Sequence, residues 1–196
     1  MDGDKRRTRG VQQGPRSTEV VERVLRATVS ELGRVGFADF SMEAVAREAG
    51  VNRTTVYRRW PTRSALLGAV VQPLMDRYDA APDTGSTQHD LELLMRQIRS
   101  SSDTPEGRAL TAATRAASEE LHELVAAIVL RASTPFRTVL QRAADAGLLD
   151  QEDVDPATQL AFFGIVMWEQ SHSGPATDSD CARLARLIVP GEQTVS

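Results

Sequence analysis

The sequence predicts an all-α protein, in which a small N-terminal group of helices precedes a larger helical bundle. Val, Ile, Tyr and Thr do not alternate with polar residues over any strand-length segment, whereas apolar residues recur at spacings of three and four. Residues 41–60 read as two short helices separated by Ala49-Gly50-Val51-Asn52. No internal repeat is evident in the sequence.

Charge is divided unevenly along the chain and predicts two domains. The 196 residues carry a net charge of −4, but residues 1–63 hold 13 Lys and Arg against 8 Asp and Glu, and the remainder holds 10 against 19. A nucleic acid would therefore meet the basic first third of the chain. We expect a disordered basic arm at residues 1–15, a head at residues 16–75 and a larger helical domain at residues 76–196.

The arm contains Lys5, Arg6, Arg7 and Arg9 and has no apolar periodicity. Two interpretations stay open, because such a run of charge either lies along DNA phosphates or the minor groove, or forms a solvated tail.

The first helix is expected over residues 17–35, with Ser17 or Thr18 as its N-cap and Gly36 as its end. Its apolar positions recur at helical spacing. We expect Phe37, Phe40 and Trp60 to complete the core of the head, because large aromatic side chains are seldom left in water.

Residues 41–60 predict a helix-turn-helix. Ser41 is a natural N-cap, Gly50 stands where the chain must turn sharply, and Asn52 caps the second helix. At about 100° per residue, Val56 points toward the first helix of the pair while Thr54 and Arg58 lie on the opposite side. The alternative is an αα-hairpin with a solvated polar face, since short helices separated by a glycine are common.

The residues around this motif resemble the tetracycline-repressor (TetR) family of bacterial transcription regulators. A capped helix precedes the motif, and Tyr57-Arg58-Arg59-Trp60-Pro61-Thr62-Arg63-Ser64 leads into a fourth helix capped by Thr62. The resemblance covers residues 16–72, and the rest of the chain agrees only in length and helicity. It implies a DNA-binding head joined by the fourth helix to a ligand-binding and dimerisation bundle. The implied function is a repressor that a small molecule releases from a pseudo-palindromic DNA operator.

The resemblance implies that the second helix of the motif enters the major groove. Arginine can fork onto guanine and threonine methyls can meet thymine, whereas tyrosine hydroxyls and arginines also hold phosphates. We favour Arg53 and then Arg58 for reading bases. Glu43 departs from family members that carry a basic residue nearby, so no operator sequence is transferred. The predicted DNA-contact residues are Ser41, Arg53, Thr54, Thr55, Tyr57, Arg58 and Arg63.

The larger domain is expected to contain six helices after a loop at residues 79–90. The resemblance implies a homodimer that forms through the last two of them. The segment at 156–170 is apolar almost all round, which is also explained by burial inside the monomer core. The expected helices cover residues 91–101, 105–117, 119–132, 134–146, 156–170 and 179–189.

A small-molecule effector pocket is likewise implied by the resemblance. Aromatic and sulfur side chains are candidates for its walls, with Glu169 or His172 as a polar contact, although such residues more often belong to the core or the surface. The candidate pocket residues are Phe136, Phe163, Met167, Trp168, Glu169 and His172.

The alternatives to a transcription regulator are an enzyme and a helical interaction protein without DNA binding. The three histidines are scattered, and the sequence has no zinc-binding HExxH, no cysteine pair and no phosphate-binding glycine loop. We expect no metal site, no cofactor and no catalysis. We also expect a cytoplasmic protein without membrane contact. The sequence has a single cysteine, Cys181, and no secretory signal, and its apolar runs are too short to span a bilayer.

Overall fold

A computed structural model describes the backbone of residues 15–115 and 118–190, and most of the predicted arm at residues 1–15 lies outside this range. Every regular element in the described part of the chain is helical, as the sequence predicted. The elements are α1 (Pro15–Val35), α2 (Met42–Glu48), α3 (Arg53–Arg59), α4 (Arg63–Met75), η1 (Asp76–Tyr78), α5 (Thr87–Ser102), α6 (Pro105–Arg115), η2 (Glu119–Leu121), α7 (His122–Asp145), η3 (Gln151–Asp153), α8 (Val154–Val166), α9 (Trp168–Ser171) and α10 (Asp178–Ile188).

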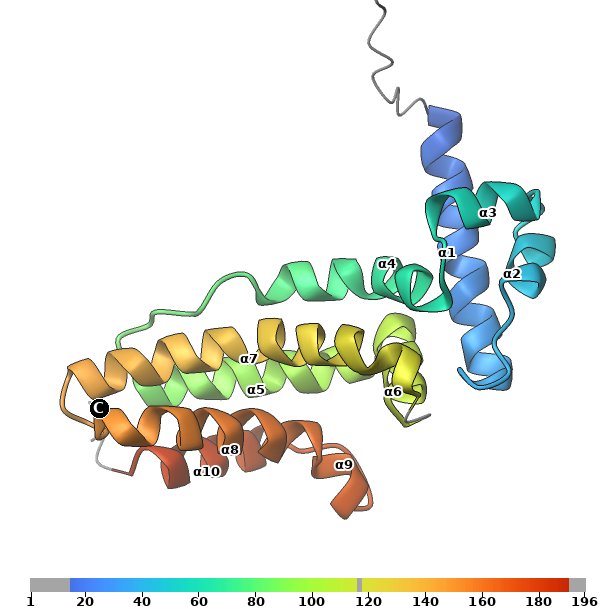
Figure 1. Cartoon of the computed structure of the whole chain (residues 1–196). Helices are drawn as coiled ribbons and strands as arrows, with labels where there is room; N and C mark the ends of the chain where they lie inside the picture. The colour runs from blue at the N-terminus through green and yellow to red at the C-terminus, as the bar shows by residue number, and fades with distance from the viewer. Residues whose placement is uncertain (1–14, 116–117, 191–196) are drawn as a thin grey trace, which may run out of the picture.

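The molecule has a head built from α1, α2 and α3, and a body in which α5, α7, α8 and α10 run side by side (Figure 1). Helix α4 leads from the head along the body, and α6 lies at the end of the body nearest the head. Two hydrophobic clusters correspond to this arrangement, one around α1 to α4 and the other among the body helices. Among the described residues, no helix is both long and apolar enough to cross a bilayer.

The head forms around the features that the sequence predicted. Ser41 and Asn52 cap α2 and α3 by accepting hydrogen bonds from Ala44 N and Thr54 N, and Gly50 has a φ of 65°. Trp60 is buried, and Val56 is the only buried residue of α3. Helix α3 is thus held by one apolar side chain on its inner side.

Two predicted helix starts were wrong by a few residues. Helix α1 is already formed at Pro15, ahead of the predicted caps Ser17 and Thr18, because proline fits the first turn of a helix. Helix α5 begins at Thr87 rather than at residue 91, because the side chain of Ser86 accepts a hydrogen bond from His89 N.

The body differs from the prediction at two helix ends. Helix α7 runs unbroken through the buried Pro135, where the sequence predicted two helices, because packing on the body cluster outweighs the hydrogen bond that proline removes. The helix predicted at 156–170 ends at Val166, and Trp168 begins the separate short helix α9, where its ring stacks on His172 with the centroids 4.0 Å apart.

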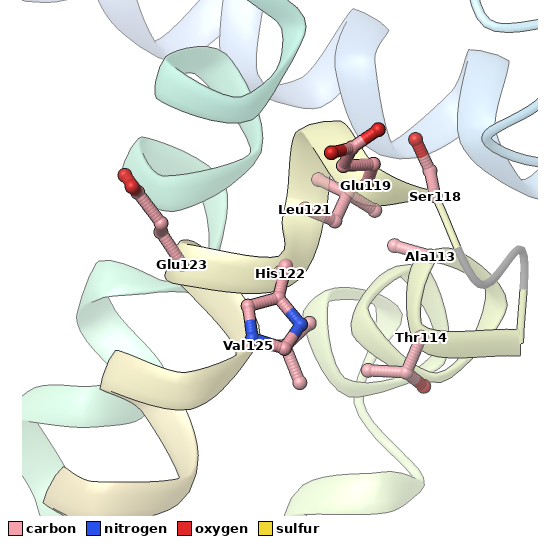
Figure 2. A pocket seen from close by; sticks show the side chains of 8 residues that line it. All are labelled: Ala113, Thr114, Ser118, Glu119, Leu121, His122, Glu123 and Val125. Atoms are coloured by element: carbon pink, nitrogen blue, oxygen red, sulfur yellow. The ribbon is translucent and has the colours of Figure 1, made fainter.

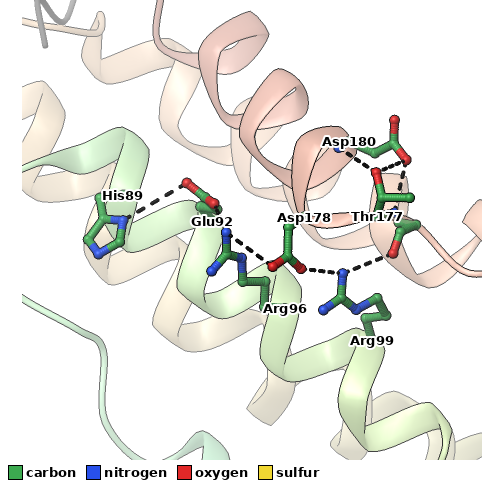
Figure 3. A network of polar contacts seen from close by, with 8 residues as sticks. His89, Glu92, Arg96, Arg99, Thr177, Asp178 and Asp180 are labelled. Atoms are coloured by element: carbon green, nitrogen blue, oxygen red, sulfur yellow. Dashed lines mark hydrogen bonds and ion pairs between the residues drawn. The ribbon is translucent and has the colours of Figure 1, made fainter.

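Helix α10 is fastened to α5 by ion pairs as well as by apolar packing. Arg99 Nη1 lies 2.7 Å from Asp178 Oδ1 and donates to the Ala176 carbonyl, while Arg96 pairs with Glu92 and Asp178 (Figure 3). The hydrogen bond from Arg99 lowers the pKa of Asp178. Asp178 therefore stays charged at neutral pH, and the pairing fixes the start of α10.

Helix α6 joins the two parts of the molecule. Its Ala109 and Ala113 belong to the head cluster, and the helix packs on α1, α4 and α5. A Cβ atom added at Gly107 would lie 2.0 Å from the carbonyl oxygen of Ser101 on α5. Only glycine permits this approach, so Gly107 sets how closely α6 lies on the body.

We therefore expect Gly107→Ala to lower the free energy of unfolding by about 1–3 kcal/mol, because a backbone must shift to admit the methyl group. Gly33→Ala is the matched control. A Cβ at this exposed α1 position meets nothing within 4 Å, so the change should stabilise the chain by up to about 1 kcal/mol through helix propensity. Chemical denaturation of the two variants measures both effects, and equal stabilities would contradict the close packing.

Candidate nucleic-acid interface and internal cavity

Helix α3 presents most of the predicted DNA-contact residues to solvent. Arg53, Thr54 and Arg58 are exposed, Thr55 is partly buried, and Tyr57 is 37% exposed. Because Val56 faces inward, the polar residues around it form one outer surface. Arg59 donates from Nη2 to Ser17 Oγ of α1 at 2.6 Å.

Tyr57 and Ser41 are both bound to Glu43 on α2. The Tyr57 hydroxyl donates to Glu43 Oε1 at 2.9 Å, and Ser41 Oγ donates to Glu43 Oε2 at 3.3 Å. The hydrogen bond from Tyr57 lowers the pKa of Glu43, and the same bond raises the pKa of Tyr57. The pair is therefore a carboxylate and a neutral phenol. The guanidinium of Arg53 lies 5.9 Å from the centre of the Tyr57 ring.

Arg63 lies at the junction between head and body. Its Nη2 is 2.6 Å from Glu120 Oε2 of η2, and its Nη1 donates to the carbonyls of Phe37, Ala38 and Phe40. Its Cζ lies 4.7 Å from the centre of the Phe37 ring. The side chain predicted to hold a DNA phosphate is paired with a carboxylate in this structure.

A surface hollow of about 440 Å³ brings together Ser41, Tyr57 and Arg63, three of the predicted DNA-contact residues. Glu43 and Glu120 line the same hollow. Each carboxylate occupies donors that a phosphate oxygen would need. A DNA backbone entering here must therefore replace carboxylate contacts with phosphate contacts.

The body has a separate, partly open cavity of about 150 Å³ between α4, η1, α5, α6, α7 and α8. Its walls are mainly aliphatic and aromatic. They are formed by Leu74, Met75, Tyr78, Ile98, Ser101, Ser102, Gly107, Leu110, Thr111, Thr114, Val125, Ile128, Val129, Ala132, Phe162 and Val166.

The predicted pocket residues lie elsewhere. Phe136 is fully buried and packs edge-on against Phe162, with the ring centroids 5.9 Å apart, whereas Phe163, Met167 and His172 are exposed. Trp168 is partly buried against the body cluster, and the side chain of Glu169 lies outside the described residues. None of the five whose side chains are described lines the cavity, because the α8 face that reaches it carries Phe162 and Val166.

A second surface hollow, of about 710 Å³, lies where η2 meets α6 and α7 (Figure 2). The carboxylates of Glu119 and Glu123 point in different directions and His122 points away from both. These residues do not converge on one point. In the described ranges 15–115 and 118–190, no group of three or more His, Cys, Asp or Glu side chains is arranged to hold a metal ion.

Two family models match the chain. Residues 24–70 match the model described as bacterial regulatory proteins of the tetR family, and residues 81–188 match the tetracyclin repressor-like C-terminal domain. The chain belongs to the TetR family. A TetR-family chain with this head is a DNA-binding transcriptional regulator, and members of such a family are normally not enzymes.

Individual TetR-family relatives agree with this assignment. The chain is 32% identical to the HTH-type transcriptional regulator AqdR of Rhodococcus erythropolis over 158 residues, 78% of this chain and 75% of AqdR. An uncharacterised HTH-type regulator of Mycobacterium tuberculosis is 37% identical over 86 residues, 43% of this chain and 44% of that protein. The structure of FadR from Bacillus subtilis in complex with stearoyl-CoA has a TM-score of 0.69 at 17% identity, covering 88% of this chain and 99% of FadR.

Glu120 is the residue at this TetR-family interface that sequence reasoning missed. No local pattern relates it to Arg63, 57 positions away. The tertiary fold alone brings the two side chains together.

We expect Glu120→Gln to strengthen DNA binding about twofold to fivefold, because it frees Arg63 and removes a negative charge from the hollow. The size follows from the value of a partly exposed ion pair, about 0–1 kcal/mol. Glu119→Gln, the same charge change next to it, is the control, since Glu119 makes no ion pair among the described residues. Fluorescence anisotropy at fixed salt compares the two, and equal effects would show that Glu120 acts only through its charge.

Proposed function

We propose that this chain is a homodimeric repressor that binds a pseudo-palindromic DNA operator and is released when a small molecule enters the body cavity. The observation that carries the DNA-binding part is the outer surface of α3, where Arg53, Thr54 and Arg58 are exposed while Val56 anchors the helix. A helix held this way enters the major groove with its N-terminal residues at base edges. We propose that the protein works in the bacterial cytoplasm, where its operator is found.

The roles of the DNA-contact residues follow from their chemistry and their present contacts. Arg53 and Arg58 are proposed to read bases, because a guanidinium pairs with both acceptors of guanine. Thr54 and Thr55 are proposed to contact bases beside them. Ser41, Tyr57 and Arg63 are proposed to contact phosphates. Their donors then leave the carboxylates of Glu43 and Glu120 and bind phosphate oxygens instead. The negative charge of Glu43 on α2 repels phosphates, so binding should depend on the favourable contacts that α3 makes.

Dimerisation is proposed to occur through α8 and α10. Leu160 is 68% exposed and Leu187 is 78% exposed, and both line a groove of about 460 Å³ between these helices. Ala157, Gly164, Leu184 and Ile188 line the same groove. Exposed leucines concentrated on two adjacent helices favour an isologous contact over a solvated surface. The exposure of Leu160 also argues against burial of α8 within the monomer core.

Release by an effector is proposed to work through α6. The cavity wall includes Gly107, Leu110 and Thr111 of α6, while Ala109 and Ala113 of the same helix lie in the head cluster. An occupant that prefers a displaced α6 would favour a different orientation of the heads. Such differential affinity for two conformations is all that coupling between two sites requires.

The purified chain should retain genomic fragments that share two half-sites whose centres are about 10 base pairs apart, because a two-fold dimer places its recognition helices about one helical turn apart. Arg53→Ala should weaken binding of a selected fragment about tenfold to hundredfold through loss of a base contact. Arg77→Ala on the body is the control for loss of one positive charge and should have little effect. Sequencing and gel-shift titration give the result, and no retention of any fragment at low salt would favour a helical interaction protein instead.

Leu160→Glu should convert the dimer to a monomer, because a charge placed in the proposed apolar contact is desolvated without a partner. Leu130→Glu is the matched control, since Leu130 on α7 is 70% exposed and lies outside the proposed interface. Light scattering coupled to size-exclusion chromatography measures the mass of each. A dimeric Leu160→Glu, or a monomeric Leu130→Glu, would place the interface elsewhere.

A further inference from the structure

The described walls of the body cavity carry no ionised group. Of the 16 described residues that line it, Tyr78 is the only one with a titratable side chain, and burial, the largest influence on its pKa, raises that pKa. Tyr78 is therefore neutral at physiological pH. Among these described residues, no carboxylate, ammonium, guanidinium or imidazole is available to pair with a charged ligand.

This composition selects against ions. Burial of an ionised group without a partner costs several kcal/mol, because the hydration that it loses is not replaced. A ligand with a carboxylate or an ammonium group would have to leave that group outside the cavity or bind in its neutral form. The aliphatic and aromatic walls instead favour an apolar ligand.

One polar group in the wall is unsatisfied. Ser101 is 3% exposed, and its Oγ forms no hydrogen bond within the part of the chain that the structure describes. The hydroxyls of Ser102, Thr111 and Thr114 are satisfied, unlike that of Ser101, because each donates to a backbone carbonyl three or four residues earlier in the same helix. The phenol of Tyr78 lies close enough to Ser101 for the two to interact, although the Ser101 hydroxyl does not reach hydrogen-bond geometry.

A buried hydroxyl without a partner costs about 1–3 kcal/mol, and a ligand atom that bonds to it recovers part of that cost. A serine hydroxyl donates to an oxygen or accepts from a hydroxyl with equal ease. Ser101 therefore supplies, in a mainly apolar site, a hydroxyl that no described residue already bonds, and a contact to it fixes the orientation of the ligand.

We propose that the cavity binds a compact, uncharged, mainly apolar ligand that carries one hydroxyl or carbonyl group, which hydrogen-bonds to Ser101 beside Tyr78. This inference rests on the proposed function for its regulatory meaning, but the binding itself does not require DNA. The cavity of about 150 Å³ matches the size of an apolar cavity known to accept benzene. A single ring with one polar substituent is therefore the scale of ligand that enters without a rearrangement of the walls.

Four probes of nearly one shape test the proposal: benzyl alcohol, toluene, benzoate and benzylammonium. Dissociation constants are measured by ligand-observed NMR at pH 7 with the full chain. Benzyl alcohol and toluene should bind saturably, and the two ions should bind at least tenfold more weakly. Equal binding of an ion and a neutral probe, or no binding of either neutral probe, would overturn the proposal.

Ser101→Ala separates the polar contact from general apolar binding. The variant should bind benzyl alcohol about threefold to tenfold more weakly and toluene no more weakly than the natural chain, because only the alcohol loses a hydrogen bond. Ser100→Ala is the matched control, since Ser100 is exposed and its hydroxyl donates to the Gln97 carbonyl. Equal effects of Ser101→Ala on both probes would overturn the assignment of Ser101.

Operator binding by the same preparations distinguishes this inference from the proposed function. A chain that retains its operator but binds none of the neutral probes would overturn the ligand class and leave the regulator intact. A chain that binds benzyl alcohol through Ser101 but retains no operator would support the ligand class and count against the regulator.

Discussion

The close approach of α6 to α5 at Gly107 is the constraint on which the rest of the structure depends. The position that a side chain would occupy is filled by the Ser101 carbonyl, so α6 lies directly on the body. The same short helix gives Ala109 and Ala113 to the core of the head. Head and body are consequently not separate units joined only by α4. They share a helix whose position is fixed from both sides.

The cavity and the hydrophobic core of the head meet at this shared helix. Leu110 and Ile128 pack against both hydrophobic clusters, and both line the cavity. The ion pair between Arg63 and Glu120 makes a second link between head and body close by. A change in the cavity therefore has a short physical route to the core of the head, which includes Val56 of α3, through packed side chains rather than through a flexible linker.

The head was predictable from sequence because its determinants are local. Caps at Ser41 and Asn52, the positive φ at Gly50 and the inward position of Val56 each follow from residues within one or two helical turns. The resemblance to the TetR family that the sequence showed rested on the same part of the chain. The helix boundaries of the body were less predictable, since tertiary packing carries α7 through Pro135 and a serine outside the expected range caps α5.

The sites that depend on long-range contacts were beyond sequence reasoning. Aromatic residues were expected in the pocket, but Phe136 lies in the body core and Phe163 is exposed, while the cavity in the body is lined mainly by aliphatic residues together with Tyr78 and Phe162. Nothing near Ser101 indicates that its hydroxyl is left without a partner. The pairing of Arg63 with Glu120 likewise appears only when the two parts of the chain are folded together.

The most direct test of the account is the distance between the two heads of the proposed dimer when α6 is displaced. Spin labels attached at position 48 of both protomers, with Glu48→Cys in a Cys181→Ser background, report that distance by double electron–electron resonance. The account predicts that Gly107→Ala shifts the distance distribution and that Gly33→Ala leaves it as in the parent. An unchanged distribution in a folded, dimeric Gly107→Ala protein would contradict the claim that α6 sets the orientation of the heads.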